Sequence, residues 1–183
     1  MRVRDPEQTR ARLVAAGLAV AGDVGLSQMT IASVLQSAGA SRGAFFHHFP
    51  DREAFVLSIH EDFHHRLLTN LQVVRAAHPA GRERLLALVR GYWRFCLGER
   101  STRALLLQAR GEGRIASASR RRSAEIARLA VEDLTAMGAA DPTHVAPLIV
   151  AMATEVALLE HEAGKSLPAN RRAFNIMLPK ANV

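Results

Sequence analysis

The sequence predicts an all-α protein, and three observations lead to that fold class. Hydrophobic residues make up 49% of the 183 residues and aromatic residues only 5%, with Ala and Leu dominant, which favours helices over sheets. Apolar residues recur at helical spacing in successive stretches that Gly and Pro separate. Residues 39–49 read as a glycine turn, a serine cap and a short helix, an arrangement with little value as bulk packing.

The first helix is expected to begin at Asp5-Pro6. Asp5 is a suitable N-cap, Pro6 takes the first helical position, and Gln8 follows three residues after the cap. Apolar and small residues then recur at helical spacing as far as Gly22, at Leu13, Val14, Gly17, Leu18 and Ala21.

Two short helices are expected next, in a motif over about residues 30–49. Thr30 caps the first of them, which runs to about Ser37. Gly39 can adopt the left-handed conformation that ends this helix, and Ser41 can cap the second through its hydroxyl. Two short helices joined by a tight glycine turn form the helix-turn-helix arrangement, whose second helix enters the DNA major groove. This pattern therefore predicts DNA binding.

Longer helices are expected over the rest of the chain. Asp51 caps a helix to about Ala77, which Pro79-Ala80-Gly81 ends. Pro147 is expected to perturb the early turns of a helix that Asp141-Pro142 opens. The helices after Gly81 are expected over residues 82–98, 101 to about 111, 117–137, 141–164 and 169–178.

The charge of the chain gives little support to DNA binding by itself. The formal net charge is +7, but residues 1–53 contain six arginines and five acidic residues, a net charge of +1. Most of the excess positive charge lies further along, including Arg120-Arg121-Arg122. The prediction of DNA binding therefore depends on where individual side chains lie.

Cysteine and hydropathy patterns predict a soluble cytoplasmic protein. Cys96 is alone, so no intrachain disulfide can form. The first residues contain no apolar run typical of a secretion signal. The longest apolar stretch, residues 145–159, contains Pro147 and Glu155 and is too short to span a bilayer.

Residues 7 to about 60 resemble the DNA-binding domain of the TetR family, the tetracycline-repressor-like bacterial regulators. Three residues depart from the family pattern: Leu35 stands in place of Ala, Phe46 in place of Tyr and Arg52 in place of Lys. The remaining two thirds of the chain are similar only in helical layout. The matching residues are Thr9-Arg10, Leu13, Ala16, Gly25, Thr30, Val34, Ala38-Gly39-Ala40-Ser41 and Arg42 to Glu53, in register.

The resemblance implies an N-terminal three-helix DNA-binding domain over residues 1–50 and a helical effector-binding and dimerisation domain over residues 51–183. Phe45 and Phe49 are expected in the core. Arg42 is expected to read guanine with two hydrogen bonds, and Ala44 to contact a thymine methyl. Arg2 and Arg4 are expected to form a loose basic arm. The residues expected at the double-stranded DNA are Arg10, Thr30, Ser41, Arg42, Gly43, Ala44, Phe46, His47, His48 and Arg52.

The resemblance also implies a homodimer that binds a palindromic operator, and a repressor that a small-molecule effector releases. A TetR-like DNA-binding protein without an effector is the alternative, and no cofactor is expected. Residues expected around the effector are Phe63, Leu67, Trp93, Cys96, Leu106, Gln108, Met152 and Glu155. Residues expected at the dimer interface are Val145, Leu148, Ile149, Met152, Val156, Leu159, Phe174, Met177 and Leu178.

One further motif raises an enzymatic alternative. His60-Glu61-Asp62-Phe63-His64 matches H-E-x-x-H, the helical pattern of zinc proteases, in which two imidazoles bind zinc and the Glu activates water. The extended pattern requires Gly and His at positions that hold Leu67 and Asn70. We therefore interpret the match as a coincidence and expect no enzyme, with a metal-binding protein or hydrolase as a distant alternative.

Overall fold

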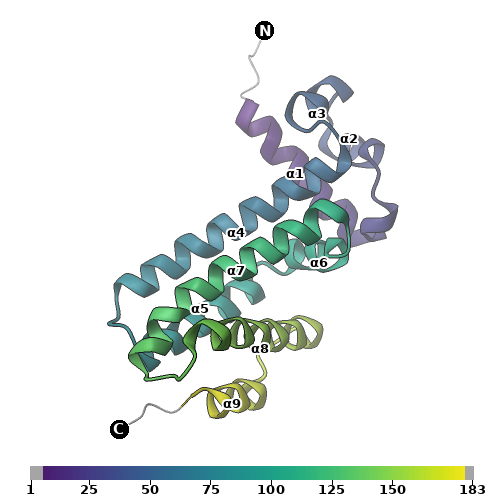
Figure 1. Ribbon diagram of the computed structural model, residues 1–183. Helices are drawn as coiled ribbons and strands as arrows, with labels where there is room; N and C mark the ends of the chain where they lie inside the picture. Colours follow the sequence, from purple (N-terminus) through teal and green to yellow (C-terminus); the bar gives the residue numbers. More distant parts are fainter. Residues whose placement is uncertain (1–5, 180–183) are drawn as a thin grey trace. The chain divides into compact units, whose positions relative to one another are not determined.

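The protein is described by a computed structural model that covers residues 6–179, and within this range it consists of helices without a strand (Figure 1). The predicted all-α fold is confirmed. The helices are α1 (Pro6–Val24), the 3-10 turn η1 (Leu26–Gln28), α2 (Ile31–Ala38), α3 (Arg42–His48), α4 (Arg52–Ala76), α5 (Arg82–Gly98), α6 (Arg100–Ala109), α7 (Gly113–Ala136), α8 (Pro142–Ala163) and α9 (Pro168–Met177).

The predicted helix starts are confirmed by their capping hydrogen bonds. The hydroxyl of Thr30 accepts from the Ser33 N–H at 3.1 Å, and that of Ser41 accepts from the Ala44 N–H at 3.2 Å. The Asp51 carboxylate accepts from the Ala54 N–H at 2.6 Å at the start of α4. The cap predicted at Asp5 and the arm predicted at Arg2 and Arg4 lie outside the described residues.

Two local features differ from the prediction. Helix α7 begins at Gly113 instead of Ser117, because the carboxylate of Glu53 accepts from the Arg114 N–H at 2.8 Å and satisfies a first-turn donor. The turn η1, between α1 and α2, was not predicted.

The helices form two compact units, each of which draws on separate parts of the sequence. The N-terminal unit comprises residues 6–63 and 101–118, and the C-terminal unit comprises residues 64–100 and 119–179. The boundaries fall inside α4 and α7, so both helices contribute to both units.

Aromatic rings fill the core of the N-terminal unit. The ring of Phe55 lies with its centroid 5.4 Å from that of Phe45 and 4.9 Å from that of Phe49. A Cβ at Gly17 would lie 2.5 Å from the Phe55 ring, so glycine permits the close approach of α1 to α4. Buried residues of α6 and of the start of α7 pack into the same core: Leu105, Ala109 and Ile115.

Trp93 is at the centre of the packing of the C-terminal unit. Its indole N–H donates to the Ala153 carbonyl of α8 at 2.9 Å, and the ring of Phe174 from α9 meets it edge-on at 5.2 Å. The Arg171 guanidinium lies over the indole at 5.1 Å and binds the fully buried Glu160 carboxylate through two nitrogens at 2.6 and 2.7 Å. These contacts fix α9 against α5 and α8.

Burial opposes the ionisation of Glu160, but its hydrogen bonds outweigh that effect. The Arg171 side chain and the Leu167 N–H donate to the carboxylate, and the Arg171 charge adds to them. Together they lower the pKa of Glu160 below its ordinary value. This buried pair is therefore ionised at neutral pH.

Candidate DNA-binding interface

Helices α2 and α3 form the predicted helix-turn-helix. A capping box opens α2, because Thr30 and Ser33 each accept from the other's backbone N–H. Gly39 ends α2 in the left-handed conformation, with φ of 57°, and the Ala40 N–H then donates to the Leu35 carbonyl. The turn therefore depends on the backbone freedom of Gly39.

Helix α3 divides into a buried face and an exposed face. Phe45 and Phe49 lie in the core, as predicted for both. The other face exposes Ser41, Arg42, Gly43, Phe46 and His47, while Ala44 and His48 are half-buried. The exposed face thus presents an arginine, a histidine and an aromatic ring on a helix whose other side is anchored.

Arg42 and Phe46 are stacked on that exposed face. The guanidinium carbon of Arg42 lies 5.3 Å from the centroid of the Phe46 ring. The Phe46 ring is 40% exposed, and it meets the buried Phe45 ring edge-on with a centroid distance of 5.6 Å. A cation that lies over an aromatic face in this range is attracted by the ring quadrupole.

The two histidines occupy the last turn of α3. Their ring centroids are 5.0 Å apart. Partial burial, the neighbouring His47 and the positive charge of Arg10 lower the pKa of His48. The guanidinium of Arg10, from α1, lies 5.8 Å from the centroid of the Phe49 ring. Arg10 is therefore close to the end of α3 where both histidines lie.

Arg52 donates to the interior of the N-terminal unit. Its Nε donates to the Met29 carbonyl at 3.1 Å and its Nη2 to the Leu26 carbonyl at 2.6 Å. Its Nη1 meets the Glu112 carboxylate at 3.4 Å. Arg52 therefore ties η1 and the Met29 that follows it to the start of α4, a role that the sequence did not predict.

Residues from α6 and α7 also hold the helix-turn-helix region. The side-chain oxygen of Gln108 accepts from the Leu26 N–H at 2.7 Å. The guanidinium of Arg114 binds Asp51 at 2.7 Å and Glu53 at 2.6 Å. Helical periodicity gives no signal for these contacts, because they join positions at least 60 residues apart.

Hydrogen bonds to Asp51 and Glu53 lower the pKa of both carboxyl groups. For Asp51 the largest cause is the Ala54 backbone N–H, followed by the Arg114 side chain. For Glu53 it is the backbone N–H of Arg114, followed by the Arg114 side chain. Both carboxylates are therefore charged partners of Arg114 at neutral pH.

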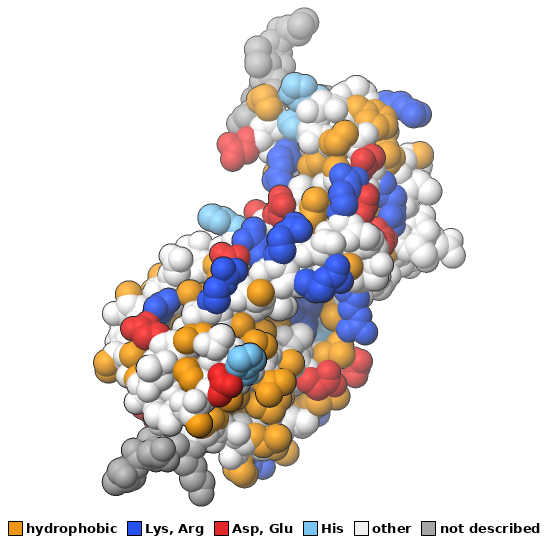
Figure 2. Space-filling view, viewed as in Figure 1, with side chains coloured by type: hydrophobic (Ala, Val, Ile, Leu, Met, Phe, Trp, Pro, Cys, Tyr) orange, Lys and Arg blue, Asp and Glu red, His pale blue; other side chains and the backbone are white. Residues whose placement is uncertain are grey.

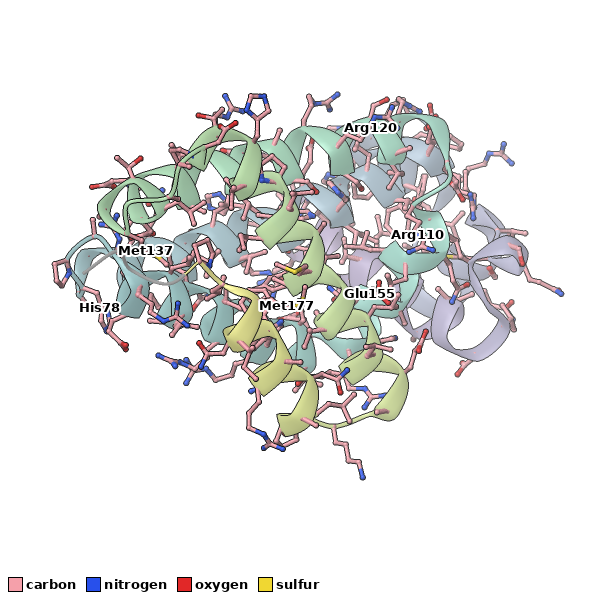
Figure 3. All side chains as sticks on the ribbon, turned by 60° about the horizontal axis from the view of Figure 1, so that its bottom comes forward. His78, Arg110, Arg120, Met137, Glu155 and Met177 are labelled. Carbon is pink, nitrogen blue, oxygen red and sulfur yellow. The ribbon has the colours of Figure 1, made fainter. Side chains whose placement is uncertain are left out.

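The residues expected around an effector lie in different environments. Leu106 packs against the core of the N-terminal unit, where Gln108 binds η1. Met152 is half-buried and Glu155 is exposed on α8 (Figure 3). The other expected residues are buried: Phe63, Leu67, Trp93 and Cys96.

The residues expected at a dimer interface differ in how exposed they are. Leu148 and Met177 are 64% and 67% exposed, and Ile176, which was not in the predicted set, is 78% exposed. Hydrophobic side chains gather over α8 and α9 on the face drawn in Figure 2. Val145, Met152 and Leu159 are half-buried, and the rest are buried in the chain: Ile149, Val156, Phe174 and Leu178.

The H-E-x-x-H motif lies on α4 with its first histidine, His60, in the protein interior. His64 is half-buried, and Glu61 and Asp62 are exposed. Within the described residues, no group of three or more His, Cys, Asp or Glu side chains has the geometry to hold a metal ion. Among the described helices, α8 alone is long and apolar enough to cross a bilayer, criteria that core helices of soluble proteins also meet.

Residues 13–59 match the sequence model of "Bacterial regulatory proteins, tetR family". This segment contains α2, α3 and the start of α4. No curated protein sequence matches the chain at a significant level.

Several solved structures share the fold over nearly the whole chain. A candidate TetR-family transcriptional regulator from Syntrophomonas wolfei superposes with a TM-score of 0.80 at 11% identity, covering 94% of this chain and 93% of its own. A candidate transcriptional regulator from Pseudomonas aeruginosa gives 0.79 at 21% identity, with 95% and 92% covered. A TetR-like transcriptional regulator from a Rhodococcus species gives 0.75 at 16% identity, with 96% and 94% covered. Residues 13–59 therefore match the N-terminal family model, and the described chain shares the fold of these solved regulators.

Proposed function

We propose that this protein is a cytoplasmic transcription regulator that binds a palindromic DNA operator as a homodimer. The observation that carries the proposal is the exposed face of α3, with Arg42, Phe46 and His47 directed away from a core that Phe45 and Phe49 anchor. An α-helix presented in this way fits the major groove, where base edges are distinguishable. The protein acts by binding, and no catalytic step is required.

Each DNA-facing residue has a chemical role in this proposal. Arg42 donates two hydrogen bonds to guanine O6 and N7, and Gly43 and Ala44 permit close approach of the helix backbone. His47 and His48 donate to phosphates or base edges. The capped N-terminus of α2 at Thr30, together with Ser41 and Arg10, contributes phosphate contacts, and Arg52 supports this region through its hydrogen bonds to Leu26 and Met29.

Arg42 and Arg52 are expected to differ in their effect on sequence preference. Arg42→Ala is expected to cost about 1–3 kcal/mol on the specific site and to relax one base position, because a base contact carries sequence information. Arg52→Ala is expected to weaken binding to all sequences alike, because Arg52 contacts no base edge. Equal losses for Arg42→Ala on specific and random DNA would remove its base-reading role.

Homodimerisation in this proposal uses α8 and α9. Leu148, Ile176 and Met177 are large, apolar and exposed, and burial against a second copy removes their surface from water. The resulting dimer places two recognition helices about 34–36 Å apart, which matches successive major grooves and half-sites related by two-fold symmetry.

A small-molecule effector is proposed to release the dimer from its operator, so that the protein acts as a repressor. A ligand achieves this only if it binds one of two conformations more tightly than the other. Because the alternative is a regulator without an effector, operator affinity that remains unchanged across a broad ligand screen would support that alternative.

The test of the proposed function is selection of binding sites from randomised duplex DNA by the purified protein. We expect enrichment of a palindrome whose half-sites are one helical turn apart. Arg42→Ala is the matched control, because it should fold normally and lose enrichment at one base position. No enrichment by a folded wild-type dimer would contradict DNA-sequence recognition.

A further inference from the structure

The stacked pair of Arg42 and Phe46 is preorganised before DNA arrives. The two residues are four apart on α3, so they share one face of the helix. The Phe46 ring rests edge-on against Phe45, which is fully buried and contacts the rings of Phe49 and Phe55. The aromatic core therefore positions Phe46, and Phe46 in turn positions the guanidinium of Arg42.

The hydrogen-bond donors of Arg42 remain available in this arrangement. Stacking over a ring uses the face of a guanidinium, whereas its N–H groups lie in its plane. Among the described residues, no ion pair engages Arg42. Arg42 is itself exposed and lies beside Phe46, a residue that is 40% exposed, so both side chains can reach a ligand at this face.

An exposed phenylalanine ring is suited to contact one apolar group on DNA. It has no polar atom to direct at a phosphate, and the apolar group at a major-groove base edge is the thymine methyl. Four residues of helix rise by about 6 Å, and successive bases are about 3.4 Å apart. A base contacted by Phe46 therefore lies one or two positions from the base that Arg42 contacts.

We propose that Arg42 and Phe46 form a single reading unit that selects a guanine with a thymine one or two positions away in each half-site. Phe46 is a positioning residue for Arg42 and reads the thymine methyl itself. This proposal rests on the proposed function, because it requires α3 in the major groove of a specific site.

The test replaces each thymine of the selected operator in turn with deoxyuridine, which removes only the methyl group. We expect about a fourfold loss of affinity at one thymine per half-site, the value for one buried methyl group. Replacement of the guanine one or two positions away by 7-deazaguanine should weaken binding as well, because it removes the N7 acceptor of Arg42.

Variants of Phe46 separate its two roles. In Phe46→Ala the deoxyuridine effect should disappear, and the 7-deazaguanine effect should shrink because Arg42 loses its support. Phe46→Leu should keep part of the methyl effect, while the guanine effect should shrink as in Phe46→Ala, since Leu is apolar but has no ring to support Arg42. Phe46→Tyr is the matched control, because it retains the ring and should retain both effects.

A DNA-free measurement checks the stacking itself. Ring currents of Phe46 should shift the NMR signals of the Arg42 Cδ protons in the free protein, and Phe46→Leu should abolish that shift. An operator whose thymines all tolerate deoxyuridine, or an equal deoxyuridine effect in Phe46→Ala, would overturn the reading unit alone. Failure of the wild type to enrich any sequence would overturn the proposed function, and the reading unit with it.

Discussion

Gly39 is a residue whose backbone conformation, and not its surroundings, determines what can replace it. Its φ is 57°, yet an added Cβ would meet no atom within 4 Å. Gly39→Ala is therefore expected to lower the free energy of unfolding by about 1 kcal/mol through backbone strain. The measurement is the urea midpoint at constant slope.

Gly43 is the matched control for Gly39. A Cβ there would also meet nothing within 4 Å, but Gly43 lies in α3 with ordinary helical backbone. Gly43→Ala is expected to raise the unfolding free energy by up to about 1 kcal/mol, because Ala has the higher helix propensity. A destabilised Gly43→Ala variant, or an unaffected Gly39→Ala variant, would contradict the argument from φ.

At position 52, the planar guanidinium of Arg differs from the ammonium of Lys in hydrogen-bond geometry, although both carry one positive charge. The Arg52 guanidinium donates to the Leu26 and Met29 carbonyls, which an ammonium group cannot satisfy in the same way. Arg52→Lys is expected to lower the unfolding free energy by about 1–3 kcal/mol, because it leaves carbonyls without their donors. Urea denaturation measures this, and full stability of Arg52→Lys would show that charge alone suffices.

At the scale of helices, the caps that depend on neighbouring residues could be predicted from the sequence, whereas contacts between distant segments could not. The caps at Thr30, Ser41 and Asp51 follow from side chains that bond to the backbone within three residues. The turn η1 carries no such signal, because its Leu26 N–H is satisfied by Gln108 from another part of the sequence. The all-α fold and the exposed α3 face were thus accessible from the sequence, whereas the supports of that face were not.

The first turns of α4 and α7 are joined by the ion pairs of Arg114 with Asp51 and Glu53, which low pH should disrupt. Asp51 and Glu53 have lowered pKa values, so they stabilise the folded state above the unfolded-state value of about 4 and lose that contribution as pH falls further. Arg114→Gln should therefore be less stable than the wild type at pH 7. The difference between the two variants should shrink as the pH falls below about 4, and a constant difference across this range would exclude the ion pairs as its cause.

Helix α9 is held to α8 by the Glu160–Arg171 pair. Arg171→Leu is expected to cost about 3 kcal/mol, because it leaves a buried carboxylate without its partner. Trp93, the single tryptophan of the chain, lies under Arg171 and should report the change through its fluorescence. The double variant with Glu160→Leu should recover part of the loss, and no recovery would indicate that Arg171 acts through packing instead.

At the scale of the whole chain, each of the two compact units combines segments that are separate in the sequence. Residues 101–118 pack with the helix-turn-helix region, and Leu105, Ala109 and Ile115 enter its core. Local sequence patterns predict where helices form but not which helices pack together, so the packing of residues 101–118 against the helix-turn-helix region could not be predicted from them. Positive charge is likewise not confined to one unit, since Figure 2 shows Lys and Arg side chains on both, interspersed with acidic ones.

The proposed dimer leads to a prediction for the assembled molecule. Introducing Glu at Leu148, Ile176 and Met177 together should produce a monomer, because each buried apolar side chain contributes about 1.5–3 kcal/mol to association and a buried carboxylate opposes it. Val73→Glu is the matched control: Val73 on α4 is 69% exposed, and this variant should remain dimeric. Sedimentation velocity measures the outcome, and the monomer should bind a palindrome no better than a half-site. A dimer that survives all three substitutions would require another interface.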